Sequence, residues 1–403
     1  MRLLGLALRN LTRNKRRTSI TALAIILGAV AIVFLRGFGN GFITNLIETN
    51  VLSKVGAVQV FRKGYLGSDD PLKTSLREDP QLVARIQAVA GVTAVAPRID
   101  FDGMVSNGSE STMFLATAID PAVEYKVCPK RLTRVAQGSQ PLQPGHEGDA
   151  LIGRTLAESL GAGKSSTLVM QAAGPHASTN ALDVEISGFL PTHSLAESKR
   201  LATVRLGFAQ DLLRMKGQVT SYVIGIQDLK QASEVAERVR AAVGEGYEVT
   251  TWVELDPQTQ TRVTSTGYSL LVVGLVLFLL VATGIINTML MSVYERVREI
   301  GTMLALGVRR WQVTALFLCE ATALGLLSAI LGIGIGWLVV RLIGHHGVHI
   351  RPPGGDVTII YPYVDGGFLV IVLAFALVGT ILSALYPAWK AARLRPVEAL
   401  RAT

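Results

Sequence analysis

The chain has 403 residues, of which 49% are hydrophobic and only 17% are charged, and its formal net charge is +9. This composition is too apolar for an ordinary soluble enzyme, whose surface needs a larger charged fraction. The length allows two or three domains.

Four stretches of the chain are apolar enough to cross a membrane. They cover residues 18–40, 267–293, 311–343 and 367–389, and Glu320 is the only acidic residue within them. A helix needs roughly 20 apolar residues to span the bilayer core. We therefore predict a membrane α-helical protein with four transmembrane helices.

Residues 1–17 form a basic leader to the first of these helices. A basic leader followed by an apolar stretch is also typical of a secretory signal. The apolar stretch is long for a signal, and no convincing small-residue cleavage site precedes the next polar stretch. We therefore expect a retained membrane anchor.

Residues 41–266 read as a large α+β domain inserted between the first and second helices. Strand-like alternation appears at 55–61, and amphipathic helices are indicated at 79–89 and 229–243. The middle, about 121–200, is richer in Gly, Pro and Ser and contains short strands. This arrangement predicts two subdomains, one of them a strand-rich insert.

No catalytic centre is indicated in this domain. Residues 161–165 (Gly-Ala-Gly-Lys-Ser) imitate the end of a phosphate-binding loop, but position 158 is Glu where the motif needs Gly. We interpret the stretch as a turn before a strand at 167–171. Cys128 and Cys319 fall in the domain and in the third helix, so no disulfide is expected.

Residues 294–310 connect the second and third helices and are predicted to form a helix that ends at Gly307, followed by two arginines. Polar and apolar side chains recur along it at helical spacing, and a helix with such a mixed face can dock into a groove of a partner. From the residues alone, a solvated connecting loop remains the alternative. The polar members are Glu295, Arg298, Glu299 and Thr302, and the apolar ones are Ile300, Met303, Leu304 and Leu306.

The basic residues are unevenly distributed along the chain. They are in excess in segments 1–17, 294–310 and 390–403, whereas 41–266 contains 22 basic and 24 acidic residues. Cytoplasmic segments of membrane proteins carry the excess of Lys and Arg. Both termini and the 294–310 segment are therefore expected in the cytoplasm, and 41–266 and the 344–366 loop outside it. This distribution also argues against nucleic-acid binding.

Two groups of polar residues near the membrane need an explanation. Glu320 lies within a membrane helix, where a carboxylate is costly and faces protein or water; a packing role and a role in a gate both remain open. His345, His346 and His349 form a small cluster, two of which could hold a metal from one side of a helix. Nearby Gly and Pro residues favour an irregular loop instead, and we predict no metal site.

The end of the first helix is rich in glycine and contains two phenylalanines. Phe38, Phe42 and Leu46 would share a helix face at spacings of four residues, and the intervening glycines offer little bulk. We predict that a cleft at the outer membrane surface receives cargo here. An ordinary helix exit with interfacial aromatic residues is the alternative.

Three stretches resemble the MacB/FtsX-type permeases of ABC transporters. They are the basic approach to the first helix (8–18), the connecting segment 295–307, and the tail 386–401. Weaker similarity to the lipoprotein-releasing LolC/LolE branch lies in the large domain, at residues 56–65, 96–98, 186–189 and Trp252.

The resemblance implies a non-catalytic permease subunit in the bacterial inner membrane, with the large domain in the periplasm. A separate cytoplasmic ATPase, which uses ATP and Mg, would dock on the connecting helix, and a second copy or a paralogue would complete a dimer. No cofactor is expected on this chain itself. The implied docking residues are Glu295, Arg296, Arg298, Glu299, Ile300, Gly301, Met303, Leu304 and Gly307.

The resemblance also indicates what the transporter moves. It implies extraction of lipoproteins or other lipophilic cargo from the outer leaflet, with a periplasmic carrier or adaptor as a possible further partner. Efflux of a drug or peptide with an adaptor, and a signalling role in cell-envelope regulation without transport, are the alternatives.

Overall fold

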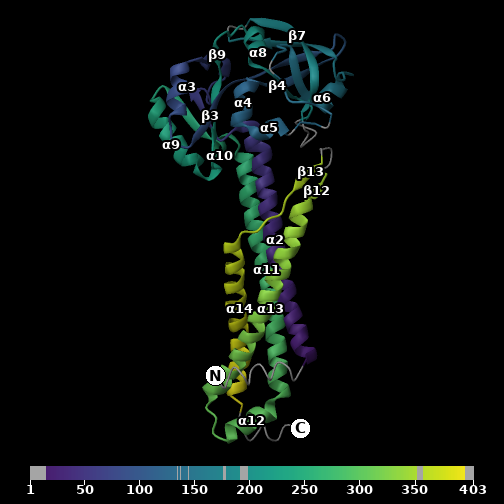
Figure 1. Ribbon diagram of the computed structural model, residues 1–403, viewed down its shortest axis with the longest axis vertical. Helices are drawn as coiled ribbons and strands as arrows, with labels where there is room; N and C mark the ends of the chain where they lie inside the picture. Colours follow the sequence, from purple (N-terminus) through teal and green to yellow (C-terminus); the bar gives the residue numbers. More distant parts are fainter. Residues whose placement is uncertain are drawn as a thin grey trace. The chain divides into compact units, whose positions relative to one another are not determined.

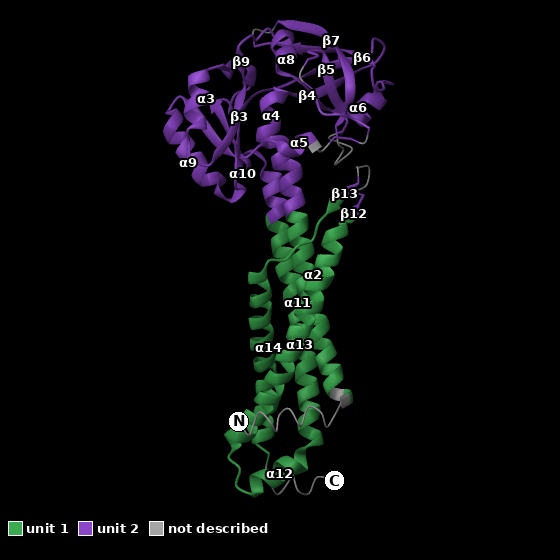
Figure 2. Cartoon of the chain, in the orientation of Figure 1, with its two compact units in different colours: residues 1–43, 264–348, 359–403 green, residues 44–263, 349–358 purple. Residues whose placement is uncertain are grey.

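The computed structural model describes residues 15–133, 135–136, 138–143, 145–175, 178–190, 198–351 and 357–394. The chain divides into two compact units, shown in different colours in Figure 2. Unit 1 comprises residues 1–43, 264–348 and 359–403, and unit 2 comprises 44–263 and 349–358. The basic residues before position 15 and those of the tail after 394 lie outside the described residues.

The described residues of unit 1 form four long helices and a short one, and Figure 1 labels each of them. The four long helices are those long and apolar enough to cross a membrane, which agrees with the predicted number. The helices are α2 (Lys15–Asn50), α11 (Pro257–Glu295), the short α12 (Val297–Ala305), α13 (Arg310–His346) and α14 (Gly366–Ala392).

Two of the long helices extend beyond the predicted membrane segments. α2 continues past residue 40 to Asn50, and α11 begins at Pro257 rather than at 267. Hydropathy marks where a bilayer would end, whereas a helix ends only where a breaker or a cap occurs. Proline is absent from 41–50, and Pro257 stands at the first position of α11, where it is tolerated.

Glycines on α13 allow close approach of its neighbours. A Cβ atom at Gly332 would lie 2.7 Å from the backbone oxygen of Ile26 in α2, and one at Gly325 would lie 2.7 Å from the side chain of Thr380 in α14. Inside a bilayer, helices gain no hydrophobic free energy by associating, so close packing must hold them together. Small residues at the crossings allow this close packing.

Unit 2 contains a nine-stranded sheet in the order β11-β1-β10-β3-β4-β8-β5-β7-β6. The strands are β1 (Val58–Arg62), β3 (Val92–Ser106), β4 (Ser111–Ile119), β5 (Asp149–Gly153), β6 (Thr167–Ala173), β7 (Thr179–Leu190), β8 (Leu201–Arg205), β10 (Ser221–Ile226) and β11 (Tyr247–Thr251). Short two-stranded sheets are formed by β2 (Leu76–Arg77) with β9 (Gln218–Val219), and by β12 (Val348–Ile350) with β13 (Thr358–Ile360).

The long strand β3 is shared between two parts of the sheet. Its first half pairs with β10, where Arg98 is opposite Ser221, and its last residues pair with both β4 and β6. The pairing with β6 closes a ring of six strands, β3-β4-β8-β5-β7-β6. Closure removes the exposed edges that an open sheet would present. The strands of the 121–200 segment all lie in this ring.

Short helices pack against the sheet of unit 2. The helix expected at 79–89 is α3 (Pro80–Gln87): Pro80 occupies its first turn, and the carboxylate of Asp79 accepts a hydrogen bond from the Gln81 N–H. The helix expected at 229–243 is α9 (Ala232–Val243), which follows the 3₁₀ turn η3 (Leu229–Gln231). The remaining segments are η1 (Val51–Val55, π-helical), η2 (Pro71–Thr74), α4 (Pro121–Val127), α5 (Pro129–Thr133), α6 (Arg154–Ser159), α8 (Leu206–Leu212) and α10 (Trp252–Leu255).

The sequence that imitates a phosphate loop is a turn, as predicted. It lies between α6 and β6, and both Gly161 and Ser165 have positive φ angles, of 60° and 66°. A P-loop would require a strand before the turn and a helix after it.

Candidate functional site

The connection between α11 and α13 forms the best-defined functional candidate in unit 1. α12 begins after Arg296, and its last residue Ala305 and C-cap Leu306 are followed by Gly307, whose φ of 89° is readily adopted only by glycine. The Gly307 N–H donates to the Leu304 carbonyl and the Val308 N–H to the Met303 carbonyl, which is a Schellman C-terminus. The predicted end at Gly307 is therefore correct.

The two arginines after Gly307 were expected to complete the end of this helix, but they lie elsewhere. Arg309 and Arg310 do not complete the C-terminus of α12 but stand at the start of α13. The Arg309 backbone N–H donates to the Gln312 side chain over 2.9 Å, so this segment caps the next helix.

α12 has an inner and an outer face. Ile300 and Gly301 are buried, and Met303 and Leu304 are half-buried against the cluster around Ile300. These four were expected to contact a partner, but they pack within this chain. The cluster comes from α11, α12, α13 and α14 and comprises Val293, Ile300, Val313, Phe317, Ala388, Ala391 and Ala392.

The outer face of α12 is polar, with one large apolar side chain. Arg298, Glu299 and Thr302 are exposed, and Leu306 at the end of the helix is 81% exposed. Glu295, the last residue of α11, is also exposed. An exposed leucine surrounded by charged residues is a surface that a partner protein can cover.

Arg296 and Glu320 form a buried ion pair. Arg296 Nη1 lies 3.2 Å from Glu320 Oε2, and the two residues are only 7% and 3% exposed. This pair joins the start of α12 to α13. It also accounts for the carboxylate inside a membrane helix, whose charge is balanced by an arginine of the connecting segment. The sequence singled out both residues, but not their contact.

A second polar contact joins α11 to α14. The Lys390 ammonium donates to the Tyr294 hydroxyl over 2.6 Å and lies 5.0 Å from the centre of its ring. Nearby, the Arg393 guanidinium stacks 4.0 Å over the Trp389 ring. Sequence reasoning missed these contacts, although all four residues fall in or beside segments that it emphasised.

The residues of the predicted cargo cleft have mixed environments. Phe38 is half-buried, with its ring 6.3 Å from that of Phe34, and Phe42 is half-buried as well. Leu46 is also half-buried but belongs to unit 2.

The space beside the neighbouring glycines is already filled by the chain itself. A Cβ at Gly37 would meet Val340 and Val364, one at Gly39 would meet Leu270, and one at Gly41 would meet the Tyr361 backbone oxygen at 2.5 Å. These glycines therefore serve packing within unit 1. The glycines were expected to let a backbone or an acyl chain approach closely, and the groups that approach them here belong to this chain.

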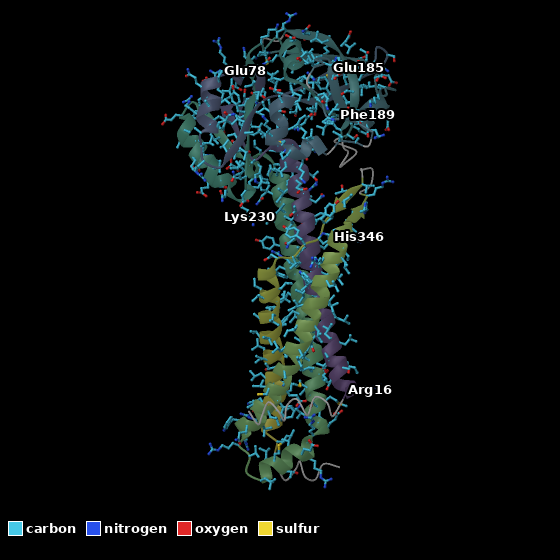
Figure 3. The ribbon with its side chains drawn as sticks, in the orientation of Figure 1. Arg16, Glu78, Glu185, Phe189, Lys230 and His346 are labelled. Atoms are coloured by element: carbon cyan, nitrogen blue, oxygen red, sulfur yellow. The ribbon has the colours of Figure 1, made fainter. Side chains whose placement is uncertain are left out.

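The three histidines lie on two different elements. His345 and His346 end α13, with ring centres 6.3 Å apart, and His349 lies in β12. Figure 3 shows the His346 side chain at the end of α13. The helix and the β12–β13 pair replace the irregular loop expected here. Within the described residues, no group of three or more His, Cys, Asp or Glu side chains could hold a metal ion.

Two family models match the chain. Residues 18–242 match the model described as MacB-like periplasmic core domain, and residues 271–396 match FtsX-like permease C-terminal. The first covers more than half of the chain and contains most of unit 2. The second contains α12 and all the predicted docking residues.

Curated relatives include proteins of more than one named type. The chain is 26% identical to the macrolide export ATP-binding/permease protein MacB of Bdellovibrio bacteriovorus, over 97% of this chain and 60% of that protein. It is 25% identical to the lipoprotein-releasing system transmembrane protein LolC of Xylella fastidiosa, over 77% of this chain and 78% of the relative. The uncharacterized ABC transporter permease YknZ of Bacillus subtilis is 41% identical over 34% of this chain and 29% of its own length. The chain thus spans 60% of the length of the MacB relative.

Two of the solved structures that resemble the chain are an extracellular domain and a periplasmic region. The extracellular domain of YknZ has a TM-score of 0.35 at 13% identity, over 48% of this chain and 100% of that domain. The periplasmic region of MacB from Actinobacillus actinomycetemcomitans has a TM-score of 0.36 at 10% identity, over 51% of this chain and 92% of that region.

The Arg296–Glu320 pair yields a prediction about stability. Removing one partner of a buried ion pair costs about 3–5 kcal/mol, because the other charge stays buried without a counter-charge. We expect Arg296→Met and Glu320→Leu each to lower the thermal unfolding temperature of the detergent-solubilised protein. The double variant should recover most of the loss. Single variants as stable as the parent chain would contradict the assignment of the pair.

Proposed function

Because the chain belongs to the MacB/FtsX-type family of ABC transporter permeases, we propose that it is the membrane subunit of a transporter driven by a separate cytoplasmic ATPase. The observation that supports this proposal most is the two-sided environment of α12. Its outer face, with Arg298, Glu299 and Leu306, is accessible to a partner, while its inner face packs on three other helices of unit 1. A force applied to α12 would therefore reach the helices that cross the membrane.

The proposed assembly follows the distribution of charge and the family. Two copies of this chain, or one copy with a paralogue, lie in the bacterial inner membrane with their termini and α12 in the cytoplasm. Unit 2 then lies mainly outside the cytoplasm. ATP and Mg are used by the ATPase, and this chain contributes no catalytic residue.

We propose a lipoprotein or another lipophilic molecule as cargo, taken from the outer leaflet. The similarity to LolC, which covers 78% of that relative, supports this choice. Half-buried Phe38 and Phe42 near the end of the predicted membrane segment, with Leu46 one turn further, would contact the acyl part. A periplasmic carrier or adaptor would receive the cargo.

Efflux of a drug or peptide is the second candidate. It is supported by the similarity to MacB proteins, which covers 97% of this chain in the relative from Bdellovibrio bacteriovorus. The two candidates share the ATPase and the coupling through α12, and differ only in what is carried.

Docking on α12 can be tested with substitutions on its outer face. We expect Leu306→Asp and Glu299→Lys to reduce ATPase co-purification on the order of 30-fold, because a central interface residue contributes about 2 kcal/mol or more. Membrane insertion should be unaffected. Lys230→Glu is the control, because Lys230 lies on the surface of unit 2 (Figure 3). Undiminished co-purification in both α12 variants would exclude this docking face.

The proposed orientation can be tested by thiol labelling of intact cells. Ser109, which is exposed in unit 2, should react as Ser109→Cys with a membrane-impermeant reagent, whereas Arg309→Cys should react only after permeabilisation. Cys128 is fully buried and should stay unlabelled in the folded protein, which provides an internal control. External labelling at position 309 would reverse the orientation.

The cargo can be tested by photo-crosslinking from Phe42. We expect a photoreactive residue at this position to crosslink to a lipoprotein, and the crosslink to disappear when ATP is hydrolysed. The same residue in place of Leu279, which is exposed on α11, should capture only phospholipid. Crosslinks from position 42 to phospholipid alone, in every nucleotide state, would exclude a lipoprotein there.

A further inference from the structure

The first long helix ends in an unusual way inside unit 2. After Asn50 the chain continues as the π-helical turn η1, which Gly56 ends with a φ of 80°. The last carbonyl groups of a helix have no partner within it and carry the negative end of its dipole. Isolated π-helical turns are rare and occur frequently at functional sites.

Side chains from elsewhere in unit 2 bind these carbonyl groups. Arg98 Nη1 donates to the Lys54 carbonyl over 2.5 Å, and Gln59 Nε2 donates to the Val55 carbonyl over 2.7 Å. Arg131 Nε donates to the Ser53 carbonyl over 3.0 Å, and its Nη2 donates to the Lys54 carbonyl over 3.2 Å. Two guanidinium groups, from β3 and α5, thus hold the end of the helix.

A buried carboxylate balances the two arginines. One carboxylate oxygen of Glu124, in α4, accepts a hydrogen bond from Arg98 Nε over 3.0 Å, and the other accepts one from Arg98 Nη2. Arg131 Nε lies 3.4 Å from this second oxygen. Arg98 is 2% exposed and Glu124 is fully buried. The Cys128 sulfur also contacts Arg98 Nη2, at 3.2 Å.

The cluster stays ionised despite its burial. Burial alone would raise the pKa of Glu124, but the charges of Arg98 and Arg131 outweigh it and hold the pKa below its ordinary value of 4.5. The stabilisation is therefore complete well above pH 4.5 and is lost only as the pH falls through the lower folded-state pKa.

Stability alone is a weak reason for such a cluster. An apolar core of the same volume is often as stable as a buried ion pair, or more stable. Apolar side chains, however, cannot bind three consecutive carbonyl groups and so cannot fix where the helix ends. The directional bonds from Arg98 and Arg131 do this, and β3 continues from Arg98 to Ser106 in the six-stranded ring.

We propose that Arg98, Glu124 and Arg131 form a joint that fixes the end of the first membrane helix to β3 and α4. A displacement of this helix then moves the sheet, instead of being absorbed by bending at residues 51–56. The joint itself is a property of unit 2. Its use in transport rests on the function proposed above, in which the ATPase supplies the displacement.

The experiment compares three variants of the full-length protein in its complex with the ATPase. Arg98→Met/Glu124→Leu removes both charges of the bidentate pair together, so the core stays apolar and filled while the Lys54 carbonyl loses its Arg98 donor. Arg98→Met alone leaves Glu124 without its main partner. Lys130→Ala is the matched control, since it breaks the more exposed pair with Glu48, at 3.1 Å.

We expect amide hydrogen exchange at residues 51–56 to accelerate at least tenfold in the double variant. Its unfolding temperature should fall less than that of the single variant, because only Arg131, whose side chain is 13% exposed, loses its carboxylate. The single variant should lose stability, and the control should change neither quantity. Cargo release should be lost in the double variant while ATP hydrolysis continues, because α12 is unchanged.

Two outcomes would overturn the proposal. Unchanged exchange at residues 51–56 in the double variant would show that the cluster does not hold the helix end, whatever the protein transports. Accelerated exchange with normal cargo release would show that the joint does not transmit movement. If the parent chain released no cargo, the proposed function would fail, and the exchange data would still decide whether the joint exists.

Discussion

Two of the buried arginines in the described part of this chain are each neutralised by a carboxylate that is buried with them. Arg296 pairs with Glu320 in unit 1, and Arg98 pairs with Glu124 in unit 2. A buried charge that loses its counter-charge costs several kcal/mol of folding free energy. The two segments that carry the members of each pair must therefore stay in contact in the folded chain. In unit 1 these segments are the start of α12 and the first third of α13. In unit 2 they are β3 and α4, and through Arg98 also the end of the first helix.

The pairing of opposite charges also explains how unit 1 accommodates polar side chains among its apolar helices. Helices in a bilayer gain nothing from hiding apolar surface from lipid, so close packing and polar contacts must hold them. Gly325 and Gly332 bring α14 and α2 against α13, while Arg296 and Glu320 satisfy each other nearer the α12 end of α13. The hydroxyl groups of Thr322 and Thr380 donate to carbonyl groups one turn earlier in their own helices, and so need no partner outside them.

The sequence was sufficient to predict features that depend on local pattern. The four apolar runs, the Asp-Pro start of α3, the turn before β6 and the glycine at the end of α12 all follow from residues close together in the chain. Features that depend on distant contacts were not accessible in this way. The inner face of α12 was taken for a docking face because an amphipathic pattern does not say whether the apolar side meets the same chain or another one.

The buried charges show the limit most clearly. Arg98 lies within an otherwise apolar stretch of β3, a pattern that indicates a buried guanidinium. Nothing in the sequence identified Glu124 as its partner. β3 also pairs with β6 and β10, which lie far from it in the sequence, and local patterns do not predict such pairings. Hydropathy predicted where the membrane segments end but not where α2 and α11 end, because it measures a preference for lipid rather than for helix.

The contacts within unit 1 define a continuous physical path from α12 to α2, and α13 is its central element. The Arg296–Glu320 pair fixes the start of α12 to α13, and Ile300 packs with Val313 and Phe317 of the same helix. Further along α13, Gly332 meets the backbone of α2 at Ile26, and a Cβ at Gly336 would lie 3.0 Å from Val33. Among the described residues, the cluster around Ile300 draws on α11, α12, α13 and α14. Coupling of this kind requires rigid, packed elements in contact. A movement of α12 therefore reaches α2 through α13, and the glycines that let the two helices approach closely are part of that path.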